Sequence, residues 1–202
     1  LGMPPYQIIQ TIILPMNNSD NKILRQYSIE YGFFIGISWF LLFYNYVQTI
    51  EQGSVIHTLG VLLMIVVSLI LPLFLGVRIN RKTTMAGFTM SYRQAFSFSL
   101  LMFFFASVLH TTGVYVFLEF VDKGDLFSTL SSMLSMPEIK STYESLGLST
   151  EYAQAIDTMK EVEKAGTANL AINFFIYDCF IGFIGSIFTS GMASHKWKRD
   201  RE

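Results

Sequence analysis

The sequence predicts an all-α integral membrane protein: a bundle of four transmembrane helices, with a partly helical external segment between spans three and four. Composition is the first observation behind this prediction. Apolar residues make up 51% of the 202 residues and charged residues only 14%, whereas soluble domains carry about 25% charged residues. The second observation is a set of four long apolar runs, because a bilayer core needs roughly 20 residues of helix to cross it. The third is the alternation of basic and acidic segments between these runs.

The four runs define the spans and, with them, the domain organisation. The predicted spans are Tyr31–Ile50, Val55–Val77, Ala95–Leu118 and Ala168–Met192. Only a few residues separate the first two spans, which predicts a tight antiparallel hairpin. The chain then divides into an N-terminal cytoplasmic or interfacial segment (1–30), the first three transmembrane helices (31–118), an external segment (119–167), the fourth transmembrane helix (168–192) and a basic cytoplasmic tail (193–202).

The charges of the connecting segments predict an orientation. The segment Arg78–Gln94 holds four basic residues and no acid, and the tail after residue 193 is basic again. Basic residues in short loops stay in the cytoplasm, and Lys22 and Arg25 before the first span agree with this placement. We therefore expect both termini in the cytoplasm of a bacterial inner membrane. Segment 119–167, with nine acids against four lysines, then lies outside, in the periplasm of a Gram-negative cell.

The first thirty residues contain one short apolar stretch. Residues Tyr6–Met16 lack a basic start and a small-residue cleavage site, so a short interfacial helix is favoured over a signal peptide. Residues Asn17–Asn21 are typical of a turn. Ser19 or Asp20 in this turn is expected to cap the helix that leads into the first span.

The external segment is predicted to contain two amphipathic helices. The first carries an apolar stripe that either lies flat on the membrane or covers the bundle, and Pro137 ends it. The second helix runs over Ser149–Lys164 and stops at Gly166. Its own stripe must pack on the first helix or on another protein. The two stripes are Leu126, Phe127, Leu130, Met133 and Leu134, then Tyr152, Ala155, Ile156, Met159 and Val162.

Asp178 is the most distinctive candidate site residue, because a carboxylate within a span costs about 2.5–3.5 kcal/mol on insertion scales. It is therefore expected to be protonated or to pair with a polar group. Asn173 and Tyr177 lie near it in the sequence, and His110 lies at a matching depth in the third span. One interpretation is a proton or cation relay, or a headgroup contact. The other is a buried hydrogen bond that locks spans three and four together or binds a partner helix.

Small residues and a proline mark the expected helix contacts. Gly32 and Gly36 form one small-xxx-small pair, and Gly182 and Ser186 form another. Such pairs let two helices approach closely, either inside the bundle or against a partner subunit. Pro72 removes one backbone donor from the second span. The resulting bend either gates a pathway or shapes the packing.

The remaining charged and metal-binding residue types indicate little chemistry. Arg78, Arg81 and Lys82 can contact anionic lipid headgroups or a phosphate, although their role in setting topology already explains them. His110 and Cys179 alone do not make a metal site, so no metal and no cofactor is predicted. The net charge of −1 gives no support for binding nucleic acid.

Several local patterns resemble a family of small four-span membrane proteins from Bacteroidota, known as domain-of-unknown-function 4199. The resemblance covers roughly residues 25–195 and implies four spans and an inner-membrane location, but no reaction. It also gives one lead for a partner, a polyprenyl-phosphate glycosyltransferase, whose genes neighbour those of similar members. The patterns are Tyr31 and Gly32 with Gly36, the basic loop through Gly87 to Ser91-Tyr92-Arg93-Gln94-Ala95-Phe96, the segment Tyr115–Asp122, and the acidic insert before a glycine-rich last span.

No catalytic motif is present in the sequence, so we do not expect an enzyme. The first functional hypothesis is an accessory or scaffolding subunit of an inner-membrane complex, whose partner is a larger membrane protein of lipid-linked sugar or envelope metabolism, or a second copy of the chain. The alternative is a small lipid-handling or transport protein that uses Asp178 and the basic cluster. Membrane lipids are expected partners in either case. An enzyme acting on lipid-linked substrates ranks third, because no further residues support it.

Overall fold

The computed structural model describes residues 18–85 and 87–194, with side chains described from Lys22 onward. The predicted interfacial helix over Tyr6–Met16 and the basic tail beyond Ser194 lie outside these residues. Four of the described helices are long and apolar enough to cross a membrane, and none of the described residues forms a strand. The prediction of an all-α membrane protein with four spans is confirmed. The four helices are α2 (Asn18–Gln52), α3 (Val55–Met85), α4 (Tyr92–Val116) and α7 (Ser149–Ser194).

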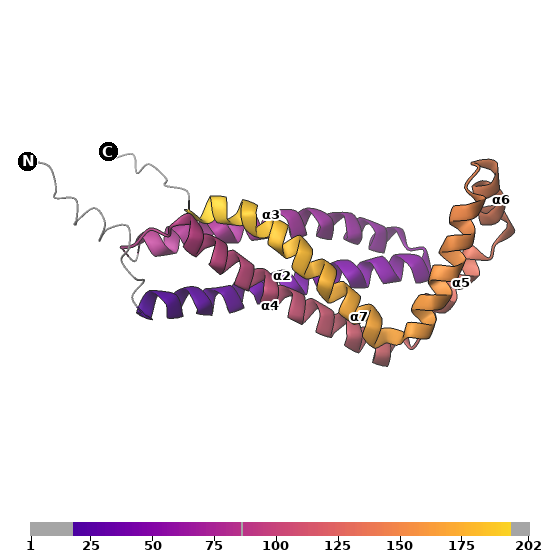
Figure 1. Ribbon diagram of the computed structural model, residues 1–202, viewed down its shortest axis with the longest axis horizontal. Coiled ribbons are helices and arrows are strands. Elements are labelled where there is room, and N and C mark those ends of the chain that lie inside the picture. Colours follow the sequence, from indigo (N-terminus) through magenta and orange to yellow (C-terminus); the bar gives the residue numbers. More distant parts are fainter. Residues whose placement is uncertain (1–17, 86, 195–202) are drawn as a thin grey trace, which may run out of the picture.

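The four long helices lie side by side as one bundle (Figure 1). Gly53 and Ser54 join α2 to α3, so these helices form the tight antiparallel hairpin that the sequence predicted. Helix α4 packs against both α2 and α7, and α3 also contacts α7. We call the end of the bundle that carries Lys22, Arg25 and the turn between α3 and α4 the basic end.

At the opposite end, an arm extends from the bundle (Figure 1). It consists of α5 (Asp125–Leu134), α6 (Pro137–Ser145) and the part of α7 before Gly166. The two predicted amphipathic helices correspond to α5 and to this first part of α7. Helix α6 was not predicted. Pro137, expected to end the first helix, follows its last residues and also occupies the first turn of α6, where its missing N–H is tolerated.

The helices at the basic end extend beyond their apolar runs. Helix α2 begins at Asn18, so the turn predicted over Asn17–Asn21 is wrong from that residue onward. Helix α3 continues to Met85, so Arg78, Arg81 and Lys82 lie on a helix and not in a loop. Hydropathy marks where the chain leaves the hydrocarbon, whereas a helix continues until its backbone hydrogen bonding is interrupted.

The turn between α3 and α4 contains both signals that end and begin a helix. Gly87 has a φ of +90°, and the N–H of Phe88 donates to the carbonyl of Thr83, as in a Schellman motif. Helix α4 then begins with a capping box: the Ser91 hydroxyl accepts from the N–H of Gln94, and the Gln94 side chain accepts from the N–H of Ser91 at 2.8 Å. These local interactions fix a short turn of the chain.

Helix α4 ends in a π-helix, η1 (Phe117–Asp122), which carries the chain toward the arm. The buried carboxylate of Asp122 accepts from the N–H of Gly124 at 3.0 Å and from that of Leu126 at 3.1 Å. Lys123, between Asp122 and Gly124, has a φ of +52°. Asp122 therefore fixes the sharp turn into α5 by satisfying backbone donors that the turn leaves free.

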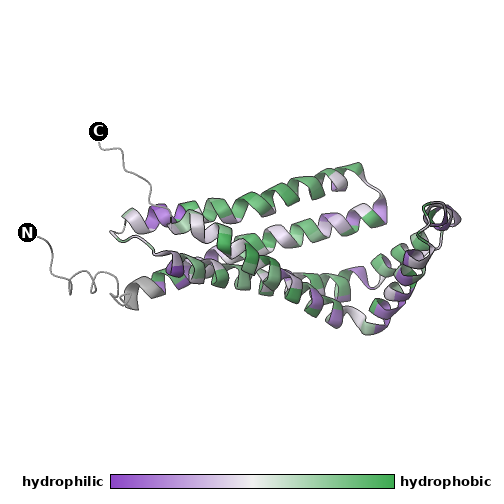
Figure 2. Ribbon diagram, turned by 45° about the horizontal axis from the view of Figure 1, so that its top comes forward, coloured by the Kyte–Doolittle hydropathy of each residue, from purple (hydrophilic) through white to green (hydrophobic). Residues whose placement is uncertain are grey.

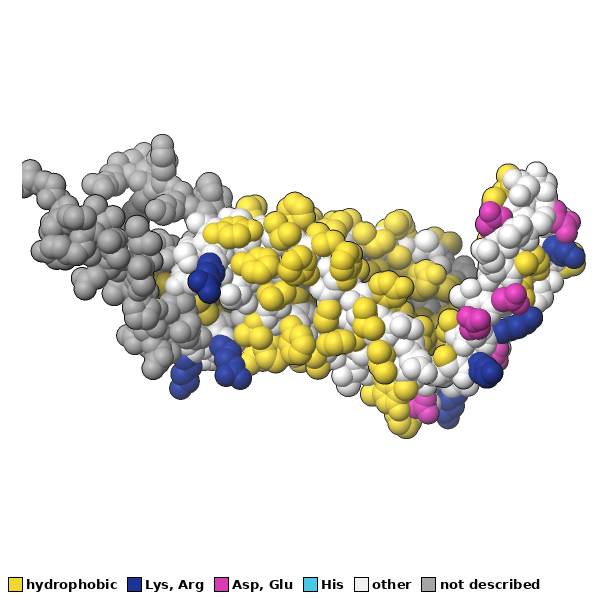
Figure 3. Space-filling view, viewed as in Figure 1, with side chains coloured by type: hydrophobic (Ala, Val, Ile, Leu, Met, Phe, Trp, Pro, Cys, Tyr) yellow, Lys and Arg dark blue, Asp and Glu magenta, His cyan; other side chains and the backbone are white. Residues whose placement is uncertain are grey.

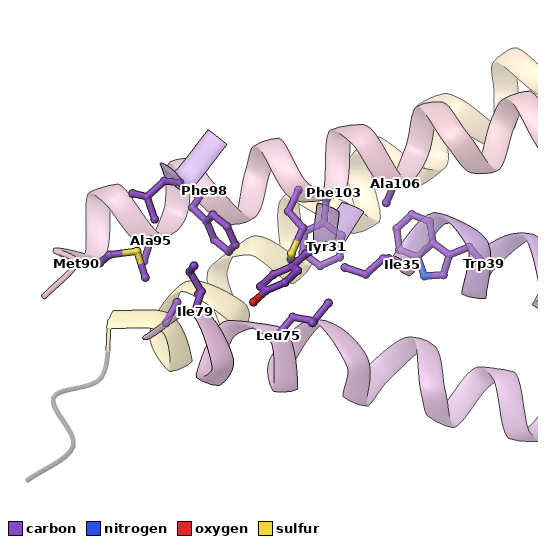
Figure 4. Close-up of a cluster of buried hydrophobic side chains, with 13 residues drawn as sticks. Tyr31, Ile35, Trp39, Leu75, Ile79, Met90, Ala95, Phe98, Phe103 and Ala106 are labelled. Atoms are coloured by element: carbon purple, nitrogen blue, oxygen red, sulfur yellow. The ribbon is translucent and has the colours of Figure 1, made fainter. Parts of the chain in front are cut away.

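The interior is built mainly from large apolar and aromatic side chains of α2 and α4. One cluster lies toward the basic end, and Figure 4 shows its side chains converging from α2, α3 and α4. Tyr31 and Ile35 in this cluster are fully buried. A second cluster lies nearer the arm and includes Phe43, Val114 and Leu126, the last of these from α5. The arm is thus anchored to the bundle through its first helix.

The glycine pair on α2 lies at the contact with α4. A Cβ added at Gly32 would lie 2.5 Å from the carbonyl oxygen of Met102, and one added at Gly36 would lie 2.9 Å from that of Ala106. The two helix backbones therefore approach closely at both positions, as small-xxx-small pairs allow. This pair serves a contact inside the bundle.

The second small-residue pair, on α7, also faces α4. A Cβ added at Gly182 would lie 2.7 Å from the Cβ of Phe103, and Ser186 is fully buried. The Ser186 hydroxyl donates to the carbonyl of Gly182 at 2.7 Å, so it needs no partner on another helix. Both pairs thus belong to internal contacts of the described bundle.

The outer surface of the bundle is apolar. Hydrophobic side chains cover its middle, and charged side chains gather at the basic end and on the arm (Figure 3). Helix α3 is hydrophobic over most of its length (Figure 2), with residues such as Leu63 and Leu69 exposed. This distribution matches a protein whose middle lies in hydrocarbon and whose ends lie in water.

We expect Gly166→Ala to destabilise the junction between the arm and the fourth span. Gly166 has a φ of +80° and a ψ of 167°, a region that is essentially restricted to glycine. An alanine there should cost about 1 to 2 kcal/mol of unfolding free energy, measured as a lower thermal unfolding midpoint in detergent. Gly191→Ala is the control, because a Cβ at Gly191 meets no atom within 4 Å. Equal unfolding midpoints for the two variants would contradict this account of the break.

Candidate functional site

A groove of about 1230 Å³ lies between α3 and α7 and continues to the arm. It forms because α3 meets α7 closely near the basic end: Gly76 packs on Thr189, and the Asn80 amide donates to the carbonyl of Met192 at 3.3 Å. Nearer the arm, both helices line the groove instead. There α3 stays with α2, where Gly60 packs on the side chain of Asn45.

The groove is long. Its lining on α7 runs from Leu170 to Thr189 within the bundle, which is about 28 Å at the rise of an α-helix. The apolar stripes of the arm extend it further: Leu126, Phe127, Leu130 and Leu134 of α5, and Ala155, Met159 and Val162 of α7, all line it.

His110 and Asp178 form a buried polar pair in the wall of this apolar groove. Nδ1 of His110 lies 2.6 Å from Oδ2 of Asp178, and the two residues are only 6% and 7% exposed. The structure thus brings together two of the candidate residues found in the sequence. The contact joins α4 to α7 in the middle of the bundle, where an unpaired carboxylate would be costly.

Aromatic rings surround the imidazole of His110. The rings of Trp39, Phe43 and Phe174 all have their centroids within 6.4 Å of the imidazole centroid, in edge-to-face arrangements. These rings were not among the site residues predicted from the sequence. Their spacing offered a signal, since Trp39 and Phe43 lie four residues apart on α2 and therefore share one helix face.

Asn173, the third candidate polar residue, is not part of this pair. It is exposed, as is Tyr177 at 67%. The expectation that either of them would partner Asp178 is wrong for a geometric reason. Five residues of α-helix turn the chain by about 140° beyond a full turn, which places Asn173 on the outer surface of α7.

Two further polar residues from α3 and α7 line the groove toward the basic end. The hydroxyls of Ser68 and Thr189 are buried, and neither has a hydrogen-bond partner among the described residues. Pro72 lines the same stretch of α3, one turn after Ser68. The predicted loss of a backbone donor at Pro72 therefore falls in the wall of the groove. Thr112, by contrast, donates back to the carbonyl of Val108 within its own helix at 2.7 Å.

The three basic residues on α3 do not converge on one site. Nζ of Lys82 lies 4.1 Å from the centroid of the Tyr27 ring and 5.8 Å from that of Tyr31, a cation–π contact with α2. Arg78 and Arg81 are exposed, and none of the three lines the groove. Across the described residues, no group of three His, Cys, Asp or Glu side chains is arranged to hold a metal ion.

Comparison with known proteins identifies the family. The sequence profile described as "Protein of unknown function (DUF4199)" matches residues 30–193. No curated protein and no solved structure matches the chain. The profile covers all four spans and the arm, which confirms the resemblance seen in the sequence. The chain therefore belongs to the DUF4199 family.

Proposed function

We propose that this protein binds a long-chain lipid of the surrounding bilayer in the groove between α3 and α7, and that it acts as a lipid-handling membrane protein. The groove itself carries this proposal, because it is long, apolar and bordered by lipid-facing surface. Ile181 and Phe188 line the groove and are also 57% and 65% exposed. The rim of the groove thus lies where hydrocarbon chains lie, and a chain can enter sideways.

The walls of the groove suit a lipid chain. They are made mainly of apolar side chains, such as those of Val61, Leu69 and Ile181. An extended hydrocarbon chain can lie along the groove, and burial of that chain against apolar walls is favourable wherever the groove would otherwise hold water.

The arm gives the proposed site a second compartment. Its apolar stripes line the end of the groove beyond the four spans, and the Tyr152 hydroxyl ties the first part of α7 to α5 by donating to the carbonyl of Leu134 at 2.8 Å. A chain bound along α7 would therefore stay covered as it leaves the membrane. This arrangement suits transfer or presentation of a lipid more than simple solvation of the protein.

The charges support one orientation for this activity. With the basic end in the cytoplasm, the arm lies on the outer side of a bacterial inner membrane, and both termini are cytoplasmic. The lipid would then be presented on the outer side.

An accessory role in a membrane complex is the second candidate function. Apolar residues of the arm away from the groove favour it: Leu146 is 66% exposed and Met136 is 46% exposed, beyond the spans where no lipid chain covers them. The partner would be a larger membrane protein with an external surface. Affinity purification from native membranes followed by mass spectrometry tests this role, and a solitary monomer after gentle extraction would count against it.

We expect Ser68→Phe to reduce lipid binding without unfolding the protein. Ser68 lines the groove and its hydroxyl has no partner among the described residues, so the added ring occupies space that a lipid chain would use. The probe is a phospholipid with a photoreactive acyl chain in vesicles of phosphatidylethanolamine and phosphatidylglycerol. Labelling of the α7 residues that line the groove, such as Phe174 and Ile181, should fall several-fold.

Ile70→Phe is the matched control for this experiment. Ile70 lies two residues further along α3, is 58% exposed and does not line the groove. It should leave the labelling of α7 unchanged. If both variants label α7 as strongly as the unchanged protein, the lipid contacts belong to the general bilayer surface and the proposed function is wrong.

A further inference from the structure

One buried atom in the groove has no partner among the described residues and points to the chemistry of the ligand. Nε2 of His110 lacks a hydrogen-bond partner, although the residue is 6% exposed and lines the groove. Buried polar atoms in native proteins are almost always satisfied. The other ring nitrogen already meets Asp178, so the side chain cannot turn away without breaking that contact.

The pair with Asp178 determines whether this nitrogen donates or accepts. A distance of 2.6 Å between Nδ1 and Oδ2 requires a proton between them. In an electrically neutral pair, that proton sits either on the carboxyl group or on Nδ1 of an imidazolium, and Nε2 carries a hydrogen in both cases. Only in a pair with a net negative charge does Nε2 carry no hydrogen, so that it can only accept a hydrogen bond.

A net negative charge is disfavoured at this position. No Lys or Arg lines the groove, and the pair lies among the rings of Trp39, Phe43 and Phe174. An uncompensated charge in such surroundings is strongly opposed by desolvation. Nε2–H is therefore a donor, and the missing partner is an acceptor that needs no charge of its own.

The depth of the pair limits which lipids can supply this acceptor. His110 lies about 5 Å from the midpoint of the helical stretch 92–122, and Asp178 about 4 Å from that of 167–194. The bilayer core extends about 15 Å to either side of its midplane. Phosphates and ester carbonyls at the edges of the core therefore lie too far away. A lipid acceptor that reaches Nε2–H must therefore belong to a group that resides deep in the hydrocarbon.

We propose that the groove binds a neutral isoprenoid quinone, with one ring carbonyl accepting a hydrogen bond from Nε2–H of His110. This inference rests on the proposed function, since it names the lipid that the groove selects. The flat ring would lie against Trp39, Phe43 and Phe174, because aromatic faces and edges pack favourably against one another. The isoprenoid tail would lie along the apolar walls of α3 and α7. The proposal concerns binding and includes no redox step.

Trp39 provides a direct readout. The chain has two tryptophans, Trp39 and Trp197, so a Trp197→Phe protein reports from the groove alone. A long-chain naphthoquinone is titrated into this protein in nanodiscs, and quenching of Trp39 fluorescence is recorded. A naphthalene with the same tail but no carbonyl groups is the matched ligand, measured by competition with the quinone. We expect it to bind about tenfold more weakly, the typical effect of leaving one buried donor unsatisfied.

Variants test the same contact from the side of the protein. His110→Phe should weaken quinone binding about tenfold and abolish the preference for the carbonyl groups. His57→Phe is the control, because His57 lies at the start of α3, bonds Asn45 and does not line the groove. The comparison of the two ligands on the Trp197→Phe protein, in which His110 is unchanged, holds even if His110→Phe does not fold.

The outcomes separate this inference from the proposed function. Equal affinity for the two ligands would overturn the quinone proposal and leave a general lipid groove intact. The quinone proposal would also be overturned if diacylglycerol, but not the quinone, lowered the photolabelling of α7 by the acyl-chain probe. Equal photolabelling of α7 in the Ser68→Phe and Ile70→Phe proteins would instead overturn the proposal that the groove is a lipid site.

Discussion

Gly32→Leu is expected to force α2 away from α4 and to cost about 3 kcal/mol of unfolding free energy, at the upper end of typical overpacking effects. A Cβ at Gly32 would lie 2.5 Å from the carbonyl oxygen of Met102 and 2.8 Å from the Cβ of Phe105. Neither atom belongs to the flexible end of a side chain, so no rotamer change relieves the clash. Steric-trap unfolding in bicelles measures the loss directly.

Gly191→Leu provides the matched comparison for this prediction. Gly191 lies within α7, and a Cβ there meets no atom within 4 Å, so the same change in residue type should shift the unfolding free energy by no more than about 0.5 kcal/mol. A Gly32→Leu protein as stable as the Gly191→Leu protein would mean that α2 and α4 do not pack as closely as the structure places them.

The consequences of separating α2 from α4 would extend to the site. Trp39 and Phe43 on α2 reach His110 on α4 through ring contacts, and they lie about two and three turns beyond Gly32. A helix pushed outward at Gly32 would therefore loosen the aromatic wall around the polar pair. Reduced quenching of Trp39 by the quinone should accompany the lower stability.

The spans and the hairpin could be predicted from the sequence because hydrocarbon thickness imposes a simple length rule. The helix ends could not, because they depend on local backbone interactions and not on hydropathy. Arg78, Arg81 and Lys82 leave the apolar run but remain on α3, since the helix ends only where Gly87 adopts a positive φ. Gly87, which follows the last basic residue of α3, indicated this helix end in the sequence, but a prediction from hydropathy does not use that information.

The polar pair could be anticipated as a possibility from the sequence, but the groove could not. His110 and Asp178 lie at similar depths on antiparallel spans, which made a contact possible, but depth alone did not select His110 over Asn173 or Tyr177 as the partner. The groove depends on how α3 leans between α2 and α7, which is set by contacts such as Gly60 on Asn45 and Gly76 on Thr189. Contacts between helices distant in sequence are decided by shape complementarity, and one sequence does not reveal which helices meet.

A double-mutant cycle on His110 and Asp178 should give the largest single effects on stability in this protein. Asp178→Leu leaves the imidazole of His110 buried without its partner. His110→Phe likewise leaves the carboxyl group of Asp178 buried without its partner. Removing one partner of a buried ion pair costs about 3–5 kcal/mol, and leaving a buried neutral polar group unpaired costs about 1–3 kcal/mol. Replacing both members by apolar side chains of similar volume is often close to neutral, so the double variant should recover most of the loss.

Steric-trap unfolding of the unchanged protein, the two single variants and the double variant gives the coupling energy between His110 and Asp178. Asn173→Leu is the control, because Asn173 lies on the same helix as Asp178 but is exposed. This substitution should change the unfolding free energy by less than about 0.5 kcal/mol. Additive losses in the double variant would show that the two side chains do not interact. The double variant also distinguishes a pair that recognises the proposed ligand from one that serves only as the buried hydrogen bond predicted from the sequence. If the pair only locks α4 to α7, a stable double variant keeps its preference for a carbonyl-bearing lipid, whereas a pair that recognises the ligand loses this preference while the bundle stays folded.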